Sequence, residues 1–513
     1  MNELMKTESK STNDEFKCRV TTPSGVVHCD KDRGSPITLH GFFPHFTQYL
    51  HESGQYDGLI NNCPLEYKSN NAPEAKDVIG TAMLSILAGH KRYCHASSLY
   101  GDGVAAELLG LNKIVSHDSI ERGLDKMDKS KAEKWLKQAY SRMYEPLLST
   151  PYVLDLDPTV KVLYGSQEKA EVGYNHQKPG RRSHCLHTYF IGTLRIVLDV
   201  EVHSGKETAG LHSHSRLWSL LDEMPLHMRP SLVRGDIGFG NEGTMVGCEV
   251  RSQNFLFKLK QSPKVKKLIS ELGTPGHNWV NAGEGWLGHE SEIKLSGWTS
   301  TRRVVVLKRK HVKKLDTLEL PGESNQMEFP LAVIVDDDDV VYEYQVLVTD
   351  TDHDIPALAQ LYRDRGDCEN NFDELKNHWG WGGFNSRKHD RSQIMMRLIG
   401  LVYNWWNVFC RLAEPEKHLE AITSRRLFQN TVGRLTKTGN SRIFYVSAVG
   451  AVAEHVLQQF TRISKFISSL ASTATQLTKE EKWAAILKEA FKVFNYNKSI
   501  KAHSDGCQNL LDL

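Results

Sequence analysis

Three acidic residues that lie far apart in the chain are the first candidates for chemistry. Asp157 ends an apolar, strand-like segment just before Pro158, Asp236 ends a second such segment, and Glu369 lies in a polar helical segment. Carboxylates at the strand ends of an α/β sheet commonly line the crevice where ligands and metals bind. Asp155, two residues before Asp157 and therefore on the same strand face, is a further candidate. Each of these residues taken alone could equally be a turn or capping residue.

Three carboxylates together have a concrete use. Mg²⁺ prefers oxygen ligands, and two such ions about 4 Å apart can serve an in-line displacement at phosphorus. One bridging carboxylate and one further ligand for each ion would suffice, and Asp157, Asp236 and Glu369 would supply that set. The three residues therefore indicate phosphoryl-transfer chemistry.

The residues around Glu369 strengthen this interpretation. On a helix with about 100° per residue, Tyr362, Arg365, Glu369 and Lys376 fall within about 60° of one another. This stripe would flank one carboxylate with two cations and a phenol, which suits a metal ligand beside a phosphate track. A surface helix with internal ion pairs is the alternative, because Arg365 and Glu369 are also helical i,i+4 neighbours.

The elements that must position these residues alternate as in an α/β protein. Between residues 152 and 260 the pattern predicts three strands, a helix, a strand, a helix and a strand. This is the element order of an RNase H-like core, although βαβ alternation fits many α/β folds. Strand-like runs between 261 and 350 indicate a β-rich insertion, and helical patterns return from Ile355 onward.

The chain is therefore expected to divide into six segments. Residues 104–109 and 116–127 resemble a helix-turn-helix, but such helix pairs are also common in proteins that never bind DNA. The expected segments are 1–72, a poorly defined N-terminal segment; 73–148, helical, with the possible DNA-binding helix-turn-helix; 149–260, the first part of the core; 261–350, the β-rich insertion; 351–412, the second part of the core; and 413–513, a helical C-terminal region.

Composition excludes several classes of protein. The 40% apolar residues, 25% charged residues and net charge of +2 are ordinary for a globular chain. No apolar run approaches the roughly 18–20 residues that span a bilayer, and the polar, mixed-charge start at Met1–Phe16 does not look like a signal peptide. Nine cysteines without a C-x-x-C pair argue against a disulfide scaffold and favour a reducing cytosol.

Two motifs could mislead. Residues 238–243 match G-x-G-x-x-G, but no acidic residue ends a following strand, so the glycines more simply let the chain turn beside Asp236. His184 and His187 flank Cys185 without a second ligand pair, which disfavours zinc. No G-x-x-x-x-G-K-[ST] loop is present, which disfavours a nucleotide cofactor.

The spacing Tyr362-x2-Arg365-x3-Glu369-x6-Lys376 resembles the Tyr-Arg-Glu-Lys signature of bacterial insertion-sequence DDE transposases, a group whose cut-and-paste members form DNA hairpins. Other landmarks of one branch of that group are similar to three further stretches of this chain. These are residues 154–159, residues 173–175 with 178–181, and residues 234–239. The resemblance runs from about Leu108 to Leu435.

This resemblance implies a fold and a set of ligands. The fold is an RNase H-like catalytic core interrupted by a β-rich insertion, with helical N- and C-terminal regions. Asp157, Asp236 and Glu369 look like the catalytic, metal-binding triad, with Asp157 bridging two Mg²⁺ ions for which Mn²⁺ is expected to substitute. The expected partners are double-stranded DNA, as terminal inverted repeats and target, and a second copy in a synaptic complex. The expected location is the bacterial cytoplasm, at the nucleoid when bound to DNA.

DNA contacts are expected from basic and aromatic residues around the triad. Hairpin-forming relatives hold a flipped base against an aromatic on the last insertion strand, where this chain has Tyr342 and Tyr344. Residues 302–314 are rich in basic side chains and suit phosphate, although a solvated face is the alternative. The expected contacts are Tyr362, Arg365, Lys376, Lys178, Arg181, Trp298, Tyr344, Arg302 and Arg303.

The function implied is cut-and-paste transposition. The resemblance implies that a 3′-hydroxyl freed at the transposon end attacks the opposite strand and later joins target DNA. The alternative is a catalytically inactive, transposase-derived protein that binds specific DNA sequences, which would predict decay of a triad that is intact here. A sugar hydrolase with two carboxylates is a third possibility, but it would not require Arg365 and Lys376 beside Glu369.

Overall fold

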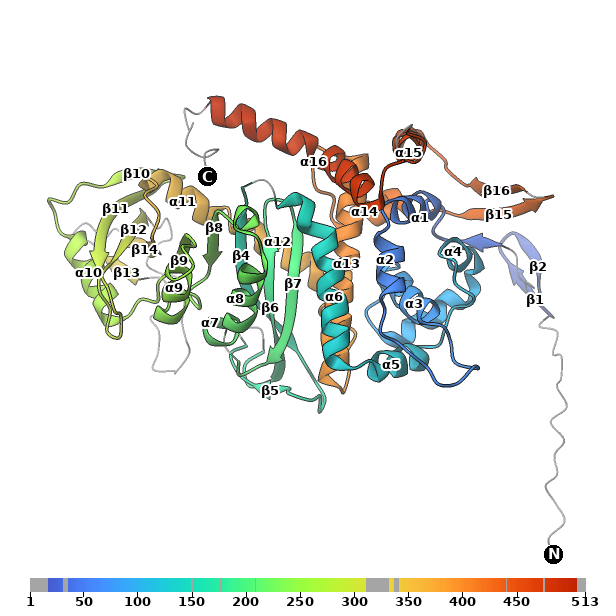
Figure 1. The fold of residues 1–513 in the computed structure, drawn as a ribbon, viewed down its shortest axis with the longest axis horizontal. Helices are drawn as coiled ribbons and strands as arrows, with labels where there is room; N and C mark the ends of the chain where they lie inside the picture. Colours follow the sequence, from blue (N-terminus) through green and yellow to red (C-terminus); the bar gives the residue numbers. More distant parts are fainter. Residues whose placement is uncertain are drawn as a thin grey trace, which may run out of the picture.

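The molecule is elongated, with a sheet-rich half joined to a helical half (Figure 1). In the computed structural model, the residues described are 17–30, 36–148, 151–175, 178–207, 209–310, 332–335, 341–439, 441–473 and 476–504. A large mixed sheet and many helices make this an α/β structure.

One sheet runs through the sheet-rich half. Its strand order is β10-β11-β12-β14-β9-β8-β4-β6-β5, with β13 paired to β14 and β7 paired to β6. The strands are β4 (Val153–Val162), β5 (Glu171–Val172), β6 (Arg182–Ile191), β7 (Ile196–Ser204), β8 (Leu232–Gly235), β9 (Phe255–Lys258), β10 (Val280–Gly283), β11 (Trp286–Ile293), β12 (Arg302–Lys310), β13 (Ala332–Val335) and β14 (Val341–Thr349).

Five of these strands surround the first two candidate carboxylates. Strands β4, β6 and β7 are antiparallel neighbours, whereas β8 runs parallel to β4 and β9 parallel to β8. The connections are helical: α7 (Ala209–His212) and α8 (His214–Glu223) precede β8, and α9 (Glu242–Glu249) precedes β9. Apart from the short β5, this is the order of strands and helices that the sequence predicts.

Strand β4 corrects one boundary. The sequence pattern predicts that this strand ends at Pro158, but the strand continues to Val162, with Pro158 opposite His187 of β6. On its other side, β4 loses its partner where β8 ends at Gly235. The missing N–H of Pro158 therefore breaks no bond toward β8, which is the circumstance in which a strand tolerates proline.

The strands of residues 280–349 extend the same sheet rather than forming a separate one. Strand β14 pairs with β9, with Leu347 opposite Lys258. Two helices cover this part of the sheet: α10 (Pro263–Gly273) buries Val265 and Ile269 in the main core, and α11 (Ile355–Arg363) buries Leu358 in a second core with β8, β9, β11, β12 and β14. This second core fixes α11 beside β8.

The helical half is built mainly from the first and last parts of the described chain (Figure 1). Its helices are α1 (Phe43–Glu52), α2 (Gln55–Asn61), α3 (Ala75–Leu87), η1 (Tyr93–Gly101), α4 (Gly103–Leu108), α5 (His117–Lys126), α6 (Lys129–Tyr144), η2 (Glu145–Leu147), α13 (His389–Ala413), α14 (Ala421–Phe428), α15 (Ala451–Ala471) and α16 (Lys479–Ser504). Helix α13 is buried along most of its length and lies against β7 at the junction of the two halves (Figure 1).

The second helix of residues 104–127 contacts the protein through part of its polar face. Helix α5 begins at its N-cap Ser116, as the sequence predicts. Its Glu121 and Asp125 both pair with Arg391 of α13, so part of its polar face is turned toward the protein. Asp118, Arg122 and Lys126 of the same helix remain exposed.

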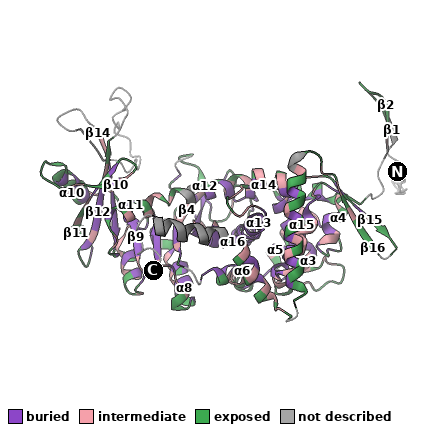
Figure 2. Cartoon of the chain, turned by 90° about the horizontal axis from the view of Figure 1, so that it is seen from above, coloured by how far each residue is buried: buried purple, intermediate pink, exposed green. Residues whose placement is uncertain are grey.

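The terminal regions are not purely helical, which corrects the expectation for both. Residues 17–30 form the hairpin of β1 (Lys17–Thr22) and β2 (Gly25–Asp30). Strands β15 (Gly433–Thr438) and β16 (Ser441–Val446) form a second hairpin, to which β3 (Ile37–Thr38) adds. Both hairpins are mostly exposed, as their green colour in Figure 2 shows. The Gly439-Asn440 dipeptide between two alternating runs was the sequence signal for the second hairpin.

Candidate active site

Asp157 and Asp236 occupy equivalent places on two neighbouring strands. Strands β4 and β8 are parallel, and their last paired residues are Leu156 and Gly235. Asp157 and Asp236 are the next residues on each strand. Because neighbouring strands lie about 4.8 Å apart and paired residues share a face, the two carboxylates belong to one side of one sheet edge. Asp236 therefore follows the end of its strand, as the sequence predicts. Asp157 lies within β4, at the point where the pairing of β4 with β8 stops.

A tight turn holds Asp236 in place. Its Oδ1 accepts the backbone N–H of Gly238 at 2.8 Å. The following glycine, Gly240, is packed so closely that a Cβ there would lie 2.3 Å from the carbonyl oxygen of Lys258. The G-x-G-x-x-G pattern therefore serves the turn beside Asp236, as the sequence analysis favours.

Arg365 and Tyr362 lie over the two carboxylates. Nη2 of Arg365 forms an ion pair with Oδ1 of Asp157, and the two side chains are only 12% and 14% exposed. The pKa of Tyr362 is raised to about 12, chiefly by burial; the charge of Arg365 lowers it, and the charges of Asp236 and Asp157 raise it. The phenol is therefore close enough to both carboxylates to sense their charge. Arg365 of the stripe and Asp157 at the strand end thus meet although they lie 208 residues apart in the chain.

The helix that carries the stripe is interrupted, so the angles calculated for one continuous α-helix need correction. Helix α11 ends at Arg363, α12 (Gly366–Glu374) starts after Arg365, and η5 (Leu375–Trp379) is a π-helix. A π-turn holds more residues than an α-turn, so Lys376 does not lie at the angle calculated for an uninterrupted α-helix. Lys376 is half-buried in this π-turn.

Glu369 lies on α12, one helical turn beyond Arg365. Four residues along an α-helix correspond to roughly 6 Å, so its backbone lies near the Arg365–Asp157 pair. The Glu369 side chain falls outside the described residues.

The carboxylates present fit a divalent cation. Asp157 and Asp236 offer oxygen ligands, which Mg²⁺ prefers, and Arg365 balances part of their charge. Within the described part of the chain, no three histidine, cysteine, aspartate or glutamate side chains are grouped as metal ligands. Glu369, the proposed third ligand, is not in that set.

Asp155, the second candidate on β4, is engaged elsewhere. Its two carboxylate oxygens accept Nε and Nη2 of Arg234 at 2.5 and 2.9 Å, and both side chains are about 2% exposed. A carboxylate that is buried against a bidentate guanidinium is a structural group, so Asp155 is not a metal ligand in this arrangement.

Four residues of the insertion that were expected to contact DNA are buried or paired with glutamates in the structure. Tyr344 and Trp298 are 2% and 8% exposed, because both belong to the core cluster. Arg302 is buried between Glu242 and Glu249, and Arg303 forms a bidentate pair with Glu290. Strand alternation predicts which residues share a face, but only tertiary packing decides which face is covered. Residues 311–314 of the basic strip lie outside the described residues.

Lys178 and Arg181 remain exposed on the loop between β5 and β6. Their cationic groups lie 5.1 and 5.6 Å from the ring centre of Tyr164, and Nζ of Lys178 contacts the Tyr164 hydroxyl at 2.5 Å. Tyr164 is 65% exposed, and the sequence analysis did not single it out. A basic group beside an exposed aromatic ring is typical of nucleic-acid surfaces. The residue types that make this surface are visible in the sequence, but the contact between Tyr164 and the two cations is visible only in the structure.

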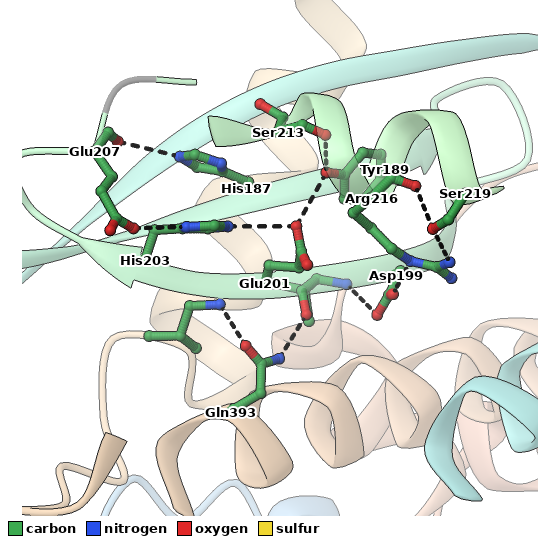
Figure 3. A network of polar contacts seen from close by, with 12 residues as sticks. His187, Tyr189, Asp199, Glu201, His203, Glu207, Ser213, Arg216, Ser219 and Gln393 are labelled. Carbon is green, nitrogen blue, oxygen red and sulfur yellow. Dashed lines mark hydrogen bonds and ion pairs between the residues drawn. The ribbon is translucent and has the colours of Figure 1, made fainter. Parts of the chain in front are cut away.

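His187 belongs to a polar network of β6 and β7 (Figure 3). The register partner of His187 on β4 is Pro158, so the His187 side chain points to the other face of the sheet from that of Asp157. It stacks on His203 at 4.1 Å, and His203 places its two nitrogens 2.7 Å from Glu207 and 3.3 Å from Glu201. Both ring nitrogens of His203 are thus already bonded to carboxylates. These contacts give the histidines a structural explanation.

None of the helices in the described part of the chain has the length and apolar character needed to cross a bilayer.

Comparisons with known proteins add the family. Among solved structures, the chain is similar to piggyBac transposase in a synaptic complex with hairpin DNA, at 10% identity and a TM-score of 0.36, over 88% of this chain and 86% of that one. That likeness is too distant to bear on individual residues, and no curated protein matches the chain. The family model described as transposase DDE domain group 1 matches residues 68–467. Because this match covers most of the sequence, the chain belongs to the family of transposases with a DDE domain of group 1.

Proposed function

We propose that this chain is an active, metal-dependent DNA transposase of the cut-and-paste type. The observation that carries the proposal is the meeting of Asp157 and Asp236 under Arg365 and Tyr362 at one sheet edge. The sheet order β7-β6-β4-β8-β9, with three antiparallel strands followed by two parallel ones, supports an RNase H-like core. The stripe resembles the Tyr-Arg-Glu-Lys signature of bacterial insertion-sequence enzymes.

Asp157, Asp236 and Glu369 would hold two Mg²⁺ ions, or Mn²⁺ in their place. When bound, such ions supply a nucleophilic oxygen at neutral pH and neutralise charge that develops at phosphorus. The side chains around them bind and orient the DNA strand. Arg365 can exchange its Asp157 contact for a phosphate oxygen. Tyr362, whose pKa is raised from 10 to about 12, is protonated at neutral pH and also well above it. Tyr362 therefore acts as a hydrogen-bond donor.

Lys178, Arg181 and Tyr164 would contact the DNA that flanks the cut. Strand β4 continues for five residues from Asp157 to Val162, toward the loop that carries them. Five strand residues span roughly 16 Å, which is the length of about five base pairs at 3.4 Å each. Two cations held beside the Tyr164 ring at that distance from Asp157 could bind the phosphates of the flanking DNA.

The partners follow from the same proposal. They are double-stranded DNA, as terminal inverted repeats and as target, and a second copy of the chain in a synaptic complex. A hairpin step would require an accessible aromatic for the flipped base. With Tyr344 and Trp298 buried, the half-buried Tyr342 beside Lys308 is the one expected aromatic left.

A cleavage assay with Asp236→Asn separates this proposal from the inactive, DNA-binding alternative. The donor is a plasmid that carries the DNA flanking this reading frame. Wild-type protein is expected to cut at the element ends only when Mg²⁺ or Mn²⁺ is added. Asp236→Asn is expected to bind the ends but to leave them uncut. Binding without any cutting by the wild-type protein in either metal would favour the inactive alternative.

A further inference from the structure

A buried arginine joins the two carboxylate-bearing strands to the helix above them. Arg234 of β8 holds Asp155 of β4 through Nε and Nη2, and its Nη1 donates to the backbone carbonyl of Leu361 on α11. Arg234 is 1% exposed. One guanidinium of β8 thus contacts two other elements, β4 and α11, that are far apart in sequence.

The position of this arginine is specific. Asp155 and Arg234 are register partners, and each lies two residues before a candidate metal ligand on its own strand. Leu361 immediately precedes Tyr362. The contact therefore lies directly beneath the residues whose relative placement the proposed chemistry needs.

The break between α11 and α12 explains why the Leu361 carbonyl needs a partner. In an uninterrupted α-helix this oxygen would accept the N–H of Arg365. Here the N–H of Arg365 bonds instead to the carbonyl of Tyr362, at 3.2 Å. Arg234 supplies a donor to the oxygen that the break would leave without its helical bond.

We propose that Asp155 and Arg234 are a positioning pair that fixes the α11–α12 segment, and with it Tyr362, Arg365 and Glu369, over Asp157 and Asp236. The proposal rests on the proposed function. Only arginine can do this, because its planar fork makes two bonds to a carboxylate and keeps a further N–H for the carbonyl. Lysine could hold Asp155 but could not also hold Leu361 in the same geometry.

Two variants test the pair. Arg234→Lys keeps the charge opposite Asp155 but removes the fork. The double variant Asp155→Leu/Arg234→Met replaces the pair by apolar side chains, a change that buried ion pairs often tolerate in stability. Arg251→Lys is the matched control, because Arg251 forms a bidentate pair with Asp222 at 2.9 and 2.8 Å and contacts neither α11 nor α12 in the described structure.

The measurements are amide hydrogen exchange of residues 361–374, binding to the element ends, and single-turnover cleavage over a series of Mg²⁺ concentrations. Both Arg234 variants are expected to exchange at least tenfold faster in this segment and to bind the ends within twofold of wild type. They are also expected to cleave at least tenfold more slowly and to need more Mg²⁺ for half-maximal rate. Arg251→Lys is expected to match the wild type throughout.

Two results overturn the pair as a positioning device. One is unchanged exchange of residues 361–374 in Arg234→Lys, whatever the cleavage rate. The other is faster exchange with wild-type cleavage and a wild-type Mg²⁺ requirement in either variant. Failure of the wild-type protein to cleave in Mg²⁺ or Mn²⁺ would instead count against the proposed function, and the exchange measurement would still decide whether Arg234 tethers the segment. If the double variant does not fold, Arg234→Lys decides alone.

Discussion

Asp157 and Arg365 pair across 208 residues of sequence, and this contact links the strand-end carboxylates to the helical stripe. The residue types and their spacing marked both groups as candidates for one site, but they did not predict this ion pair. They were not sufficient to separate Asp155 from Asp157, because both lie on one strand face. Arg234 distinguishes the two aspartates, because it forms a buried ion pair with Asp155. No periodic pattern in the sequence indicates that pair.

At Tyr362 we expect a hydrogen bond rather than proton transfer. Because its pKa is raised to about 12, the phenol stays protonated throughout the range in which DNA cleavage is measured. Tyr362→Phe should lower the single-turnover cleavage rate about tenfold through loss of that bond, without changing the shape of the pH–rate profile between pH 7 and pH 10. A profile that loses an ionisation step in the variant would show that the phenol titrates during the reaction.

Lys161 gives a pH dependence of stability. Its side chain is buried, and it donates to the carbonyl of Gly383 and to Sδ of Met396. Its strand neighbour His184 has its pKa lowered to about 4, chiefly by burial, and is therefore neutral. Burial likewise lowers the pKa of Lys161 to about 7, from an ordinary value of 10.5. Between these values the unfolded chain binds more protons, so the Lys161 contribution to folding stability rises with pH.

Lys161→Met should remove that dependence. The variant is expected to be more stable than the wild type by about 2 kcal/mol at pH 6, and this advantage should disappear by pH 10. Urea unfolding at pH 6, 8 and 10 measures the difference. A difference that stays constant with pH would mean that Lys161 is charged in the folded protein across the whole range.

At the scale of elements, the interruption between α11 and α12 is the main departure from the expected structure. Periodicity predicts one helix, and the residues of the stripe are compatible with it. At the break, the backbone carbonyl of Leu361 is bonded by Arg234 of strand β8, and periodicity does not encode a bond between segments so far apart in the sequence. The strands around it were predictable because their apolar runs are local. The burial of Tyr344 and Trp298 was not, because it depends on which face α10 and the core cover.

Helix α13 closes the open edge of β7 with side-chain amides. Gln393 bonds to the backbone of Val200 and Val202, as Figure 3 shows, and Asn404 bonds to both N–H and C=O of Val197, at 2.9 and 2.7 Å. An uncovered strand edge is a site for unwanted pairing. The amides therefore join the sheet to the helical half without a further strand.

Asn404→Ala should destabilise the fold, since it leaves two buried backbone groups without partners. The expected loss is about 2–4 kcal/mol in the free energy of unfolding. Urea unfolding measures it, with the exposed Asn70→Ala as control. Equal midpoints for the two variants would mean that the β7 edge gains little from α13.

At the scale of the whole molecule, the net charge of +2 conceals where DNA would bind. Lys178 and Arg181 are exposed and lie beside the ring of Tyr164. Arg302 and Arg303, in contrast, form ion pairs with glutamates. Affinity for the element ends should fall steeply between 50 and 200 mM salt, because phosphate contacts release counterions. The double variant Lys178→Ala/Arg181→Ala should reduce the slope of log K against log salt by about 2.

The control for that measurement removes the same charge elsewhere. Lys131 and Lys134 are exposed on α6, in the helical half. Lys131→Ala/Lys134→Ala should leave the slope unchanged. Equal slopes for the two double variants would assign the salt dependence to overall charge and not to the loop. Salt-independent binding by the wild-type protein would instead favour a substrate without phosphates.

The claim on which the whole account depends is that Glu369 joins Asp157 and Asp236 in one metal-binding catalytic site. The most direct test is Mg²⁺-dependent cleavage of element ends by Glu369→Gln, beside Asp373→Asn, which changes an exposed carboxylate four residues further along the same helix. The account predicts that Glu369→Gln binds the ends but does not cut them, while Asp373→Asn cuts at the wild-type rate. Cutting by Glu369→Gln at the wild-type rate would contradict it.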